Sequence, residues 1–187
     1  MRYNLLTILG VLFVPIAHSF KFVLPTDLGD GVFDGAINST TGSVTWTKIS
    51  DLPADLQRRV DASEPKAGRL SVRGDNSPAA RPLNKRDQTG CTNHDVPNIN
   101  HLYDSFRAGC YNEINAKHIR TLSSGGYFWY GCNYNNHAYY CNPNDIKIAY
   151  DSINYSCGAG RTGWDHLDVP NFTSGVEQLG YGTCGNL

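Results

Sequence analysis

One stretch of the sequence decides the fold, Gly126-Tyr127-Phe128-Trp129-Tyr130-Gly131-Cys132-Asn133-Tyr134. Aromatic residues at this density favour an extended β-strand. Asn135-Asn136 can form a turn, and His137-Ala138-Tyr139-Tyr140-Cys141 supplies a second strand. The sequence therefore predicts a β-hairpin over residues 126–141.

An amphipathic helix is predicted on each side of this hairpin. The first has apolar residues at steps of three and four: Ile99, Leu102, Tyr103, Phe106, Cys110 and Ile114. The second begins at a cap in Asn142-Pro143-Asn144-Asp145 and ends at Gly158. Its apolar stripe is Ile146, Ala149, Tyr150, Ile153 and Cys157. Further strands are expected at 161–164 and 178–184, so the prediction is an α+β sandwich of an antiparallel sheet and two helices.

Cysteines occur only after position 90. They are Cys91, Cys110, Cys132, Cys141, Cys157 and Cys184. A small secreted domain gains stability from disulfides, typically about 2–4 kcal/mol each. The even number predicts three bridges among 15 possible connectivities. Within these we favour a bridge between Cys110 and Cys141.

The amino terminus has the pattern of a secretory signal peptide. Arg2 precedes ten apolar residues, 5–14, and Ala17-His18-Ser19 offers a cleavage site before Phe20. A membrane-spanning helix needs about 20 apolar residues, twice this number. We therefore expect residues 1–19 to be removed and the protein to be secreted, with no membrane span.

Residues 20–86 are predicted to be a pro-segment. They hold one alternating strand at 43–49, a short helix at 51–60 and a Ser/Pro/Gly/Arg-rich stretch from 61 to 82 that is typical of flexible linkers. The dibasic pair Lys85-Arg86 then separates this cysteine-free part from the cysteine-rich part. Exposed, flexible sites of this kind are cut by proteases, so we expect a mature domain at 87–187.

Five short motifs carry a resemblance to a known group. They are Asp30-Gly31-Val32-Phe33, Gly90-Cys91, Trp129-Tyr130-Gly131-Cys132-Asn133, Cys157-Gly158 and Gly180-Tyr181-Gly182-Thr183-Cys184. Together with the processing pattern, their layout resembles small cysteine-rich secreted proteins of filamentous fungi, some of them effector-like. The order of elements is more distantly similar to killer-toxin-like α/β sandwiches. The resemblance implies location and class, and no catalytic residue.

Charge and motif spacing narrow the chemistry. Residues 87–187 carry five Lys+Arg against nine Asp+Glu, a formal charge of −4, which argues against nucleic acid as a partner. The histidines and cysteines lack zinc-ligand spacings, and neither a nucleophile elbow nor a phosphate loop is present. We therefore expect no metal and no cofactor.

Three functions stay open. The first is an effector or toxin that binds an extracellular, host or competitor molecule as a monomer. Its expected contact surface is Asn133, Asn135, Asn136, His137, Asp165, His166 and Asp168. The second is a small hydrolase that pairs His137 with Asp145 or Asp151, or Asp165 with Asp168. The third is a carbohydrate-binding module that uses exposed Tyr and Trp rings.

Three sequons could carry glycans, at Asn38, Asn154 and Asn171. Asn38 belongs to the expected pro-segment, and Asn154 lies on the second predicted helix between Ile153 and Cys157, which limits its accessibility. Asn171 follows Pro170 in a turn-like stretch. Of the two in the mature domain, Asn171 is therefore the better acceptor.

Overall fold

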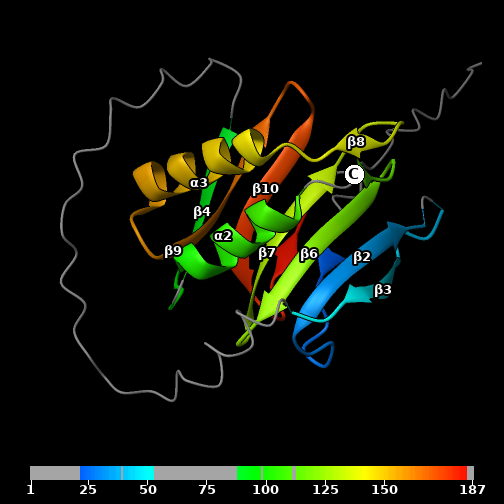
Figure 1. Ribbon diagram of the computed structural model, residues 1–187, viewed down its shortest axis with the longest axis horizontal. Coiled ribbons are helices and arrows are strands. Elements are labelled where there is room, and N and C mark those ends of the chain that lie inside the picture. The colour runs from blue at the N-terminus through cyan, green and yellow to red at the C-terminus, as the bar shows by residue number, and fades with distance from the viewer. Residues whose placement is uncertain (1–21, 39, 53–87, 98, 111–112, 185–187) are drawn as a thin grey trace, which may run out of the picture.

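The computed structural model describes residues 22–38, 40–52, 88–97, 99–110 and 113–184. Seven strands form the main sheet: β2 (Gly31–Ile37), β3 (Val44–Ser50), β4 (Gln88–Asp95), β6 (His118–Ser124), β7 (Tyr127–Asn133), β9 (Arg161–Leu167) and β10 (Phe172–Gln178). Their order is β3-β2-β6-β7-β10-β9-β4, and every neighbouring pair is antiparallel. Helices α2 (Ile99–Gly109) and α3 (Pro143–Cys157) lie on one face of this sheet (Figure 1). The α+β sandwich predicted from the sequence is confirmed.

Four short strands form two small sheets beside the main one. β1 (Phe22–Val23) pairs with β11 (Gly182–Thr183), which brings the two ends of the described chain together. β5 (Glu113–Ile114) pairs with β8 (Tyr139–Tyr140). The strand expected at 161–164 is observed as β9, and of the strand expected at 178–184 only β11 is observed. β10 (Phe172–Gln178) was not predicted.

The central hairpin differs from the one predicted. It joins β6 to β7, with Ser124 opposite Tyr127. Gly125 and Gly126 both have positive φ, 60° and 83°, as a two-residue turn between strands requires. The predicted partner strand was wrong, because this Gly-Gly turn reverses the chain just before the aromatic run. Residues 139–140 pair with β5 instead.

Both predicted helices are present, and the first is shorter than expected. α2 buries its predicted stripe up to Phe106 and ends at Gly109, a residue that weakens a helix because it has no side chain. Ile114 was expected on this helix but is fully buried in β5. α3 starts at the predicted cap, where the Asn142 side chain accepts a hydrogen bond from the Asn144 amide, and it ends at Gly158.

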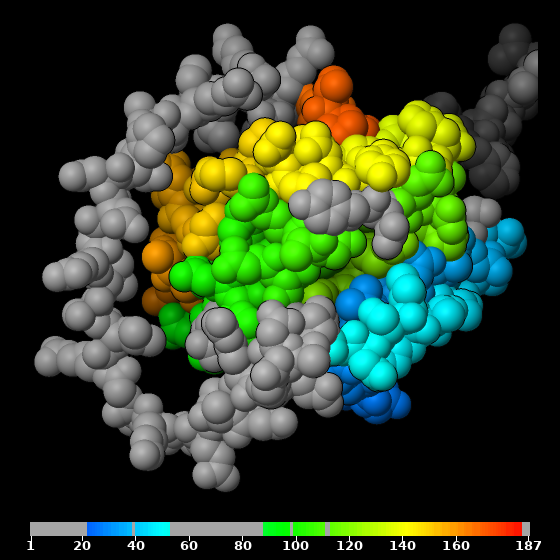
Figure 2. All heavy atoms as spheres, in the orientation of Figure 1, coloured from blue at the N-terminus to red at the C-terminus, as the bar shows by residue number. Residues whose placement is uncertain are grey.

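The helices and the sheet enclose an aromatic core. Tyr103 of α2 stacks on Tyr150 of α3 with ring centroids 4.0 Å apart, and the surfaces of the two helices adjoin in Figure 2. Beneath them, Trp129 of β7 is fully buried and its Nε1 donates to Ser174 Oγ at 2.8 Å. The indole N–H, which would be costly to bury without a partner, thereby has a hydrogen-bond acceptor.

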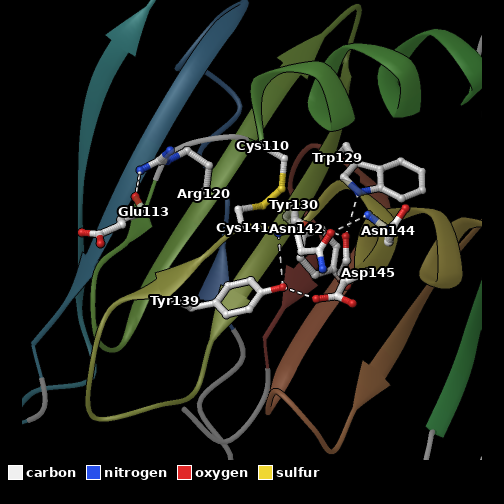
Figure 3. Close-up of a disulfide and its surroundings, with 11 residues drawn as sticks. Cys110, Glu113, Arg120, Trp129, Tyr130, Tyr139, Cys141, Asn142, Asn144 and Asp145 are labelled. Carbon is white, nitrogen blue, oxygen red and sulfur yellow. Dashed lines mark hydrogen bonds between the residues drawn. A yellow bond between two sulfur atoms is a disulfide. The ribbon is translucent and has the colours of Figure 1, made fainter.

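All six cysteines are paired. The bridges are Cys91–Cys157, Cys110–Cys141 and Cys132–Cys184. The expected Cys110–Cys141 bridge is therefore present, and it ties the chain just after α2 to the chain just before α3 (Figure 3). Three disulfides are typical of proteins from oxidising compartments such as the extracellular space.

The cysteine-free region contributes more structure than the sequence predicted. The strand expected at 43–49 is β3, but β1 and β2 were not expected. β2 pairs with β6 and so extends the sheet formed by the cysteine-rich part. Residues 53–60 of the helix expected at 51–60, the linker and Lys85-Arg86 lie outside the described residues. Cleavage and the limits of the mature domain stay predictions.

Candidate functional site

Helices α2 and α3 cover one face of the sheet, and we call the opposite face the helix-free face; the β1–β11 pair covers part of it through Phe22, Leu24 and Cys184. One row across this face consists of Tyr130, Gly175, Trp164 and Gly90, each paired with the next across strands β7, β10, β9 and β4. A Cβ atom on Gly90 would clash with the Trp164 indole, and one on Gly175 would lie 2.7 Å from the Tyr130 hydroxyl. The two glycines therefore let both rings lie against the sheet.

A groove with a cavity of about 590 Å³ runs over this row. Its lining is Gln88, Thr92, Tyr130, Tyr134, Trp164, His166, Asp168, Asn171, Thr173, Gly182, Thr183 and Cys184. The volume is in the range of small-ligand sites, which combine apolar walls with a few polar groups. The Cys132–Cys184 bridge ties the β11 side of the groove to β7 in the sheet.

His166 is the best-positioned polar group in the groove. Its Nδ1 lies 2.8 Å from Thr173 Oγ1 and its Nε2 lies 3.6 Å from Asp168 Oδ1. The Tyr134 ring meets the imidazole edge-on, with centroids 5.5 Å apart. A hydrogen bond at one nitrogen and the Tyr134 ring thus orient the imidazole, and it still lines the groove.

A second polar cluster lies at the end of the groove near Thr92. Glu177 is 3% exposed, although a buried carboxylate is costly unless it is hydrogen-bonded. Its Oε2 accepts from Thr92 Oγ1 at 2.5 Å, and its Oε1 lies 3.1 Å from His94 Nδ1. Thr92 Oγ1 also lies 2.7 Å from Thr162 Oγ1. Both carboxylate oxygens of Glu177 therefore have hydrogen-bonding partners, and these fix its position.

An irregularity in β4 produces this cluster. The register of β4 against β9 shifts between Cys91 and Asp95, and Asn93 has a φ of 62°. Bulges are common next to active sites. Here the His94 amide donates to Thr162 Oγ1 at 2.8 Å, and the side chains of Thr92 and His94 both contact Glu177. The His94 side chain stays 32% exposed.

Tyrosines in the groove stay protonated well into the alkaline range. Burial raises the pKa of Tyr130 well above 10, with smaller contributions from Tyr134 and Glu177. Burial also raises the pKa of Tyr134, and a hydrogen bond to Thr173 partly opposes it. At neutral pH the groove therefore presents hydroxyl donors and acceptors, and not phenolates.

The residues of the expected contact surface differ in exposure, and their role in contacts stays a prediction. Asn136, His137 and Asp168 are exposed, and Asn135 and His166 are half-buried. Asn133 and Asp165 are fully buried, so their expected place on a contact surface is wrong. Both side chains point to the helix side of the sheet, since each is the neighbour in its strand of a residue on the helix-free face.

Asn133 is buried because it holds a loop together. Its Nδ2 lies within 3.0 Å of the carbonyl oxygens of Ile114, Asn115 and His137. Its Oδ1 accepts from the backbone and side-chain nitrogens of Asn135. A single amide thus joins β7 to β5 and to the loop that leads into β8. Asp165 accepts a hydrogen bond from Thr89 Oγ1 at 2.6 Å.

The acid–base pairs proposed from the sequence find other partners. Asp145 accepts a hydrogen bond from the Tyr139 hydroxyl beside the Cys110–Cys141 bridge (Figure 3). Burial and this bond raise the pKa of Tyr139. Asp151 pairs with Lys147 at 2.5 Å. Asp165 is buried, whereas Asp168 is exposed and lies next to His166. Sequence reasoning missed the pair of His94 and Glu177, which lies behind Thr92 and does not itself line the groove.

A second cavity of about 470 Å³ lies on the helix side of the sheet. It is bounded by Val32, Ile49 and Ser50 of the amino-terminal strands and by residues of α2, among them His101 and Asp104. It therefore lies at the junction of the two parts of the chain, and Arg120 in its lining pairs with Asp34 and donates to the Glu113 carbonyl oxygen.

The three sequons differ in accessibility. Asn38 is exposed at the turn between β2 and β3, where its Oδ1 accepts from the amides of Thr40 and Thr41. Asn154 is half-buried on α3, and Asn171 is half-buried beside the groove. Their glycosylation stays a prediction.

Among the described residues, no group of three His, Cys, Asp or Glu side chains is close enough to hold a metal ion. Neither described helix has the length and apolar character needed to cross a membrane.

Comparison with known proteins gives no match at any level. No protein-family model matches the sequence. No curated protein matches it, and no solved structure matches the fold. The function is therefore argued from the groove and its chemistry.

Proposed function

We propose that the protein is a secreted, effector-like or toxin-like protein that acts by binding, and that its ligand lies in the groove of the helix-free face. The observation that carries this proposal is the cavity of about 590 Å³ over the Tyr130–Trp164 row. The signal-peptide pattern and the resemblance to cysteine-rich secreted proteins of filamentous fungi support secretion and the biological class.

The chemistry of the groove favours a carbohydrate of a host or competitor. The half-buried Trp164 ring lies against Gly90, which leaves its outer face towards the groove. Aromatic faces suit the apolar side of a sugar ring. Gln88, His166 and Asp168 supply the hydrogen-bonding groups that would orient hydroxyls.

A rigid floor strengthens this proposal. Paired strands β7, β10 and β9 form the floor of the groove. The Cys132–Cys184 bridge joins β7 to the chain just after β11, which forms one side of the groove. A site that is already ordered loses little conformational entropy when a ligand binds, and this favours affinity.

The test is calorimetric titration of the secreted protein with a panel of soluble oligosaccharides of neutral hexoses and N-acetylhexosamines. At least one of them should bind, and His166→Ala should weaken it at least about tenfold, the loss of one charged or well-placed hydrogen bond. His137→Ala is the matched control, because His137 is an exposed histidine outside the groove. No binding by any member of the panel, or equal binding by both variants, would contradict the proposal.

Hydrolysis is a second candidate, favoured by the His94–Glu177 pair. A carboxylate that orients an imidazole is a common arrangement for acid–base catalysis. Hydrolysis of an oligosaccharide that binds should then be lost in His94→Gln with its affinity unchanged. If wild type and variant both leave the bound oligosaccharide intact, as chromatography of the products would show, this second candidate is wrong.

A further inference from the structure

The outer edge of β6 is covered by a segment that the sequence marks as removable. β6 lies between β7 and β2 (Figure 1). β2 pairs antiparallel with β6 from Gly31 opposite Ser123 to Ala36 opposite His118. Without β2, the backbone N–H and C=O groups on this edge would lack partners, and unpaired strand edges bind other extended chains. The edge therefore fits an extended segment.

Residues 22–52 also bury apolar side chains on both sides of the sheet. Phe22 and Leu24 pack with Ile119, Phe128 and Tyr130 on the helix-free face. Leu52 packs into the core beneath the helices, and Phe33 is 2% exposed. In Figure 2 the atoms of β2 and β3 lie directly against the rest of the protein. The segment thus completes the cores of the cysteine-rich part.

Polar contacts fix the register of the same segment. Asp34 Oδ2 lies 2.6 Å from His118 Nδ1, and Asp34 Oδ1 lies 3.5 Å from Arg120 Nη2. Asp30 Oδ1 accepts a hydrogen bond from the Gly125 amide at 3.1 Å. Alternation along a strand means that a slip by one residue would break these pairs and would also move Phe33 to the other face.

The covalent connection between the two parts is a single stretch of chain. All three disulfides join residues between 91 and 184, and none reaches 22–52. Both dibasic pairs of the sequence, Arg58-Arg59 and Lys85-Arg86, lie between Leu52 and Gln88. A cut at either pair therefore leaves residues 22–52 held by non-covalent contacts alone.

We propose that residues 22–52 stay bound after such a cut, as a non-covalent subunit seated on the β6 edge and on the Phe128–Tyr130 surface. The working form is then a two-chain protein, with one chain that ends after Leu52 and one that holds the three disulfides. This inference concerns assembly and does not depend on the ligand of the groove.

The experiment starts from the intact secreted chain, cut with a dibasic-specific protease. The products are separated by size-exclusion chromatography in native buffer and, in parallel, in a denaturing concentration of guanidinium chloride, and each peak is weighed by mass spectrometry. We expect the chain that holds residues 22–52 and the chain that holds the disulfides in one native peak and in separate peaks after denaturation; a cut at both dibasic pairs also releases the peptide 60–86. Loss of the amino-terminal chain in native buffer, whether the remainder stays soluble or precipitates, would overturn the proposal.

A pair of variants tests the surface itself. Leu24→Ala removes a side chain that is 1% exposed, and Val23→Ala removes its neighbour, which is 50% exposed. After the cut, Leu24→Ala should raise the dissociation constant of the two chains at least about thirtyfold, as large-to-small core substitutions do. Val23→Ala should change it less than about threefold. Equal dissociation constants for the two variants would refute the assigned surface, and the wild-type result stands even if Leu24→Ala fails to fold.

Discussion

Residues 22–52 and residues 88–184 share one sheet but are held in it by different forces. The cysteine-rich part has three disulfides that restrict its unfolded chain. The amino-terminal segment is held by strand pairing, by four buried apolar side chains and by the contacts of Asp34 with His118 and Arg120. It has no covalent cross-link. Reduction of the disulfides should therefore destabilise residues 88–184, whereas truncation of buried apolar side chains should loosen residues 22–52.

The largest effect is expected from the core of the amino-terminal segment. Phe33→Ala should lower the free energy of unfolding by about 3–5 kcal/mol, the cost of emptying a buried phenylalanine site. Ile49→Ala on β3, where the side chain is 51% exposed, should cost less than about 0.5 kcal/mol. Urea unfolding followed by tryptophan fluorescence measures both. Similar values for the two variants would mean that the segment contributes no core.

The next effect concerns the covalent part. Replacing both Cys110 and Cys141 by alanine should lower the free energy of unfolding by about 3 kcal/mol, since this bridge closes a loop of 31 residues. The amino-terminal segment should stay paired, which hydrogen exchange of the β2 amides can show. Faster exchange in β2 than in β7 after this change would mean that the bridge supports the segment as well.

A smaller effect is expected at the loop that Asn133 holds. Asn133→Ala removes the amide that serves three carbonyl oxygens, and it should cost about 2 kcal/mol because buried acceptors lose their partner. Asn136→Ala, the exposed residue of the same loop, is the control and should be close to neutral. Thermal unfolding measures the midpoint temperature of each variant. Equal midpoints for Asn133→Ala and Asn136→Ala would show that Asn133 does not stabilise the loop.

The buried tyrosines should have the smallest effect on the free energy of unfolding at neutral pH and a clear effect at alkaline pH. Burial raises the pKa of Tyr130, Tyr134 and Tyr139 in the folded protein. In the unfolded chain tyrosine ionises near pH 10. The folded state therefore keeps protons that the unfolded state releases, and stability should be unchanged below about pH 9 and fall above about pH 10.

Urea unfolding between pH 8 and pH 11 measures this dependence. Tyr130→Phe should reduce the slope above pH 10, and Tyr140→Phe, at a residue that is 65% exposed, should leave it unchanged. A flat profile for the wild type would contradict burial as the cause. Tyr130, Tyr134 and Tyr139 all belong to the cysteine-rich part. High pH, like reduction, should therefore destabilise that part first.

Much of the fold was predictable because its signals are local. The stripe from Ile99 to Phe106, the Asn142 cap and the aromatic run of β7 each fix an element without help from distant residues. The pairing of β7 was missed because two turns competed, and the winning one, Gly125-Gly126, has the stronger preference for positive φ.

The site was less predictable because it depends on strands far apart in the chain. Thr92, Thr162 and Glu177 come from β4, β9 and β10, and no spacing in the sequence shows that they meet. Glu177 alternates with apolar residues in β10, a pattern that does mark it as facing away from the helices. His166 and Asp168 were predicted, whereas Asn133 and Asp165 were misplaced because polar residues are usually exposed.

The bulge in β4 has a consequence for how copies of the protein meet in concentrated solution. β4 and β3 are the two outer strands of the main sheet, and an outer strand can recruit the same strand of another copy and start a fibril-like stack. Where β4 shifts register, residues 92–94 no longer offer an even row of backbone groups. The irregularity that gathers Thr92 and His94 around Glu177 thus also interrupts the edge that would otherwise seed aggregation.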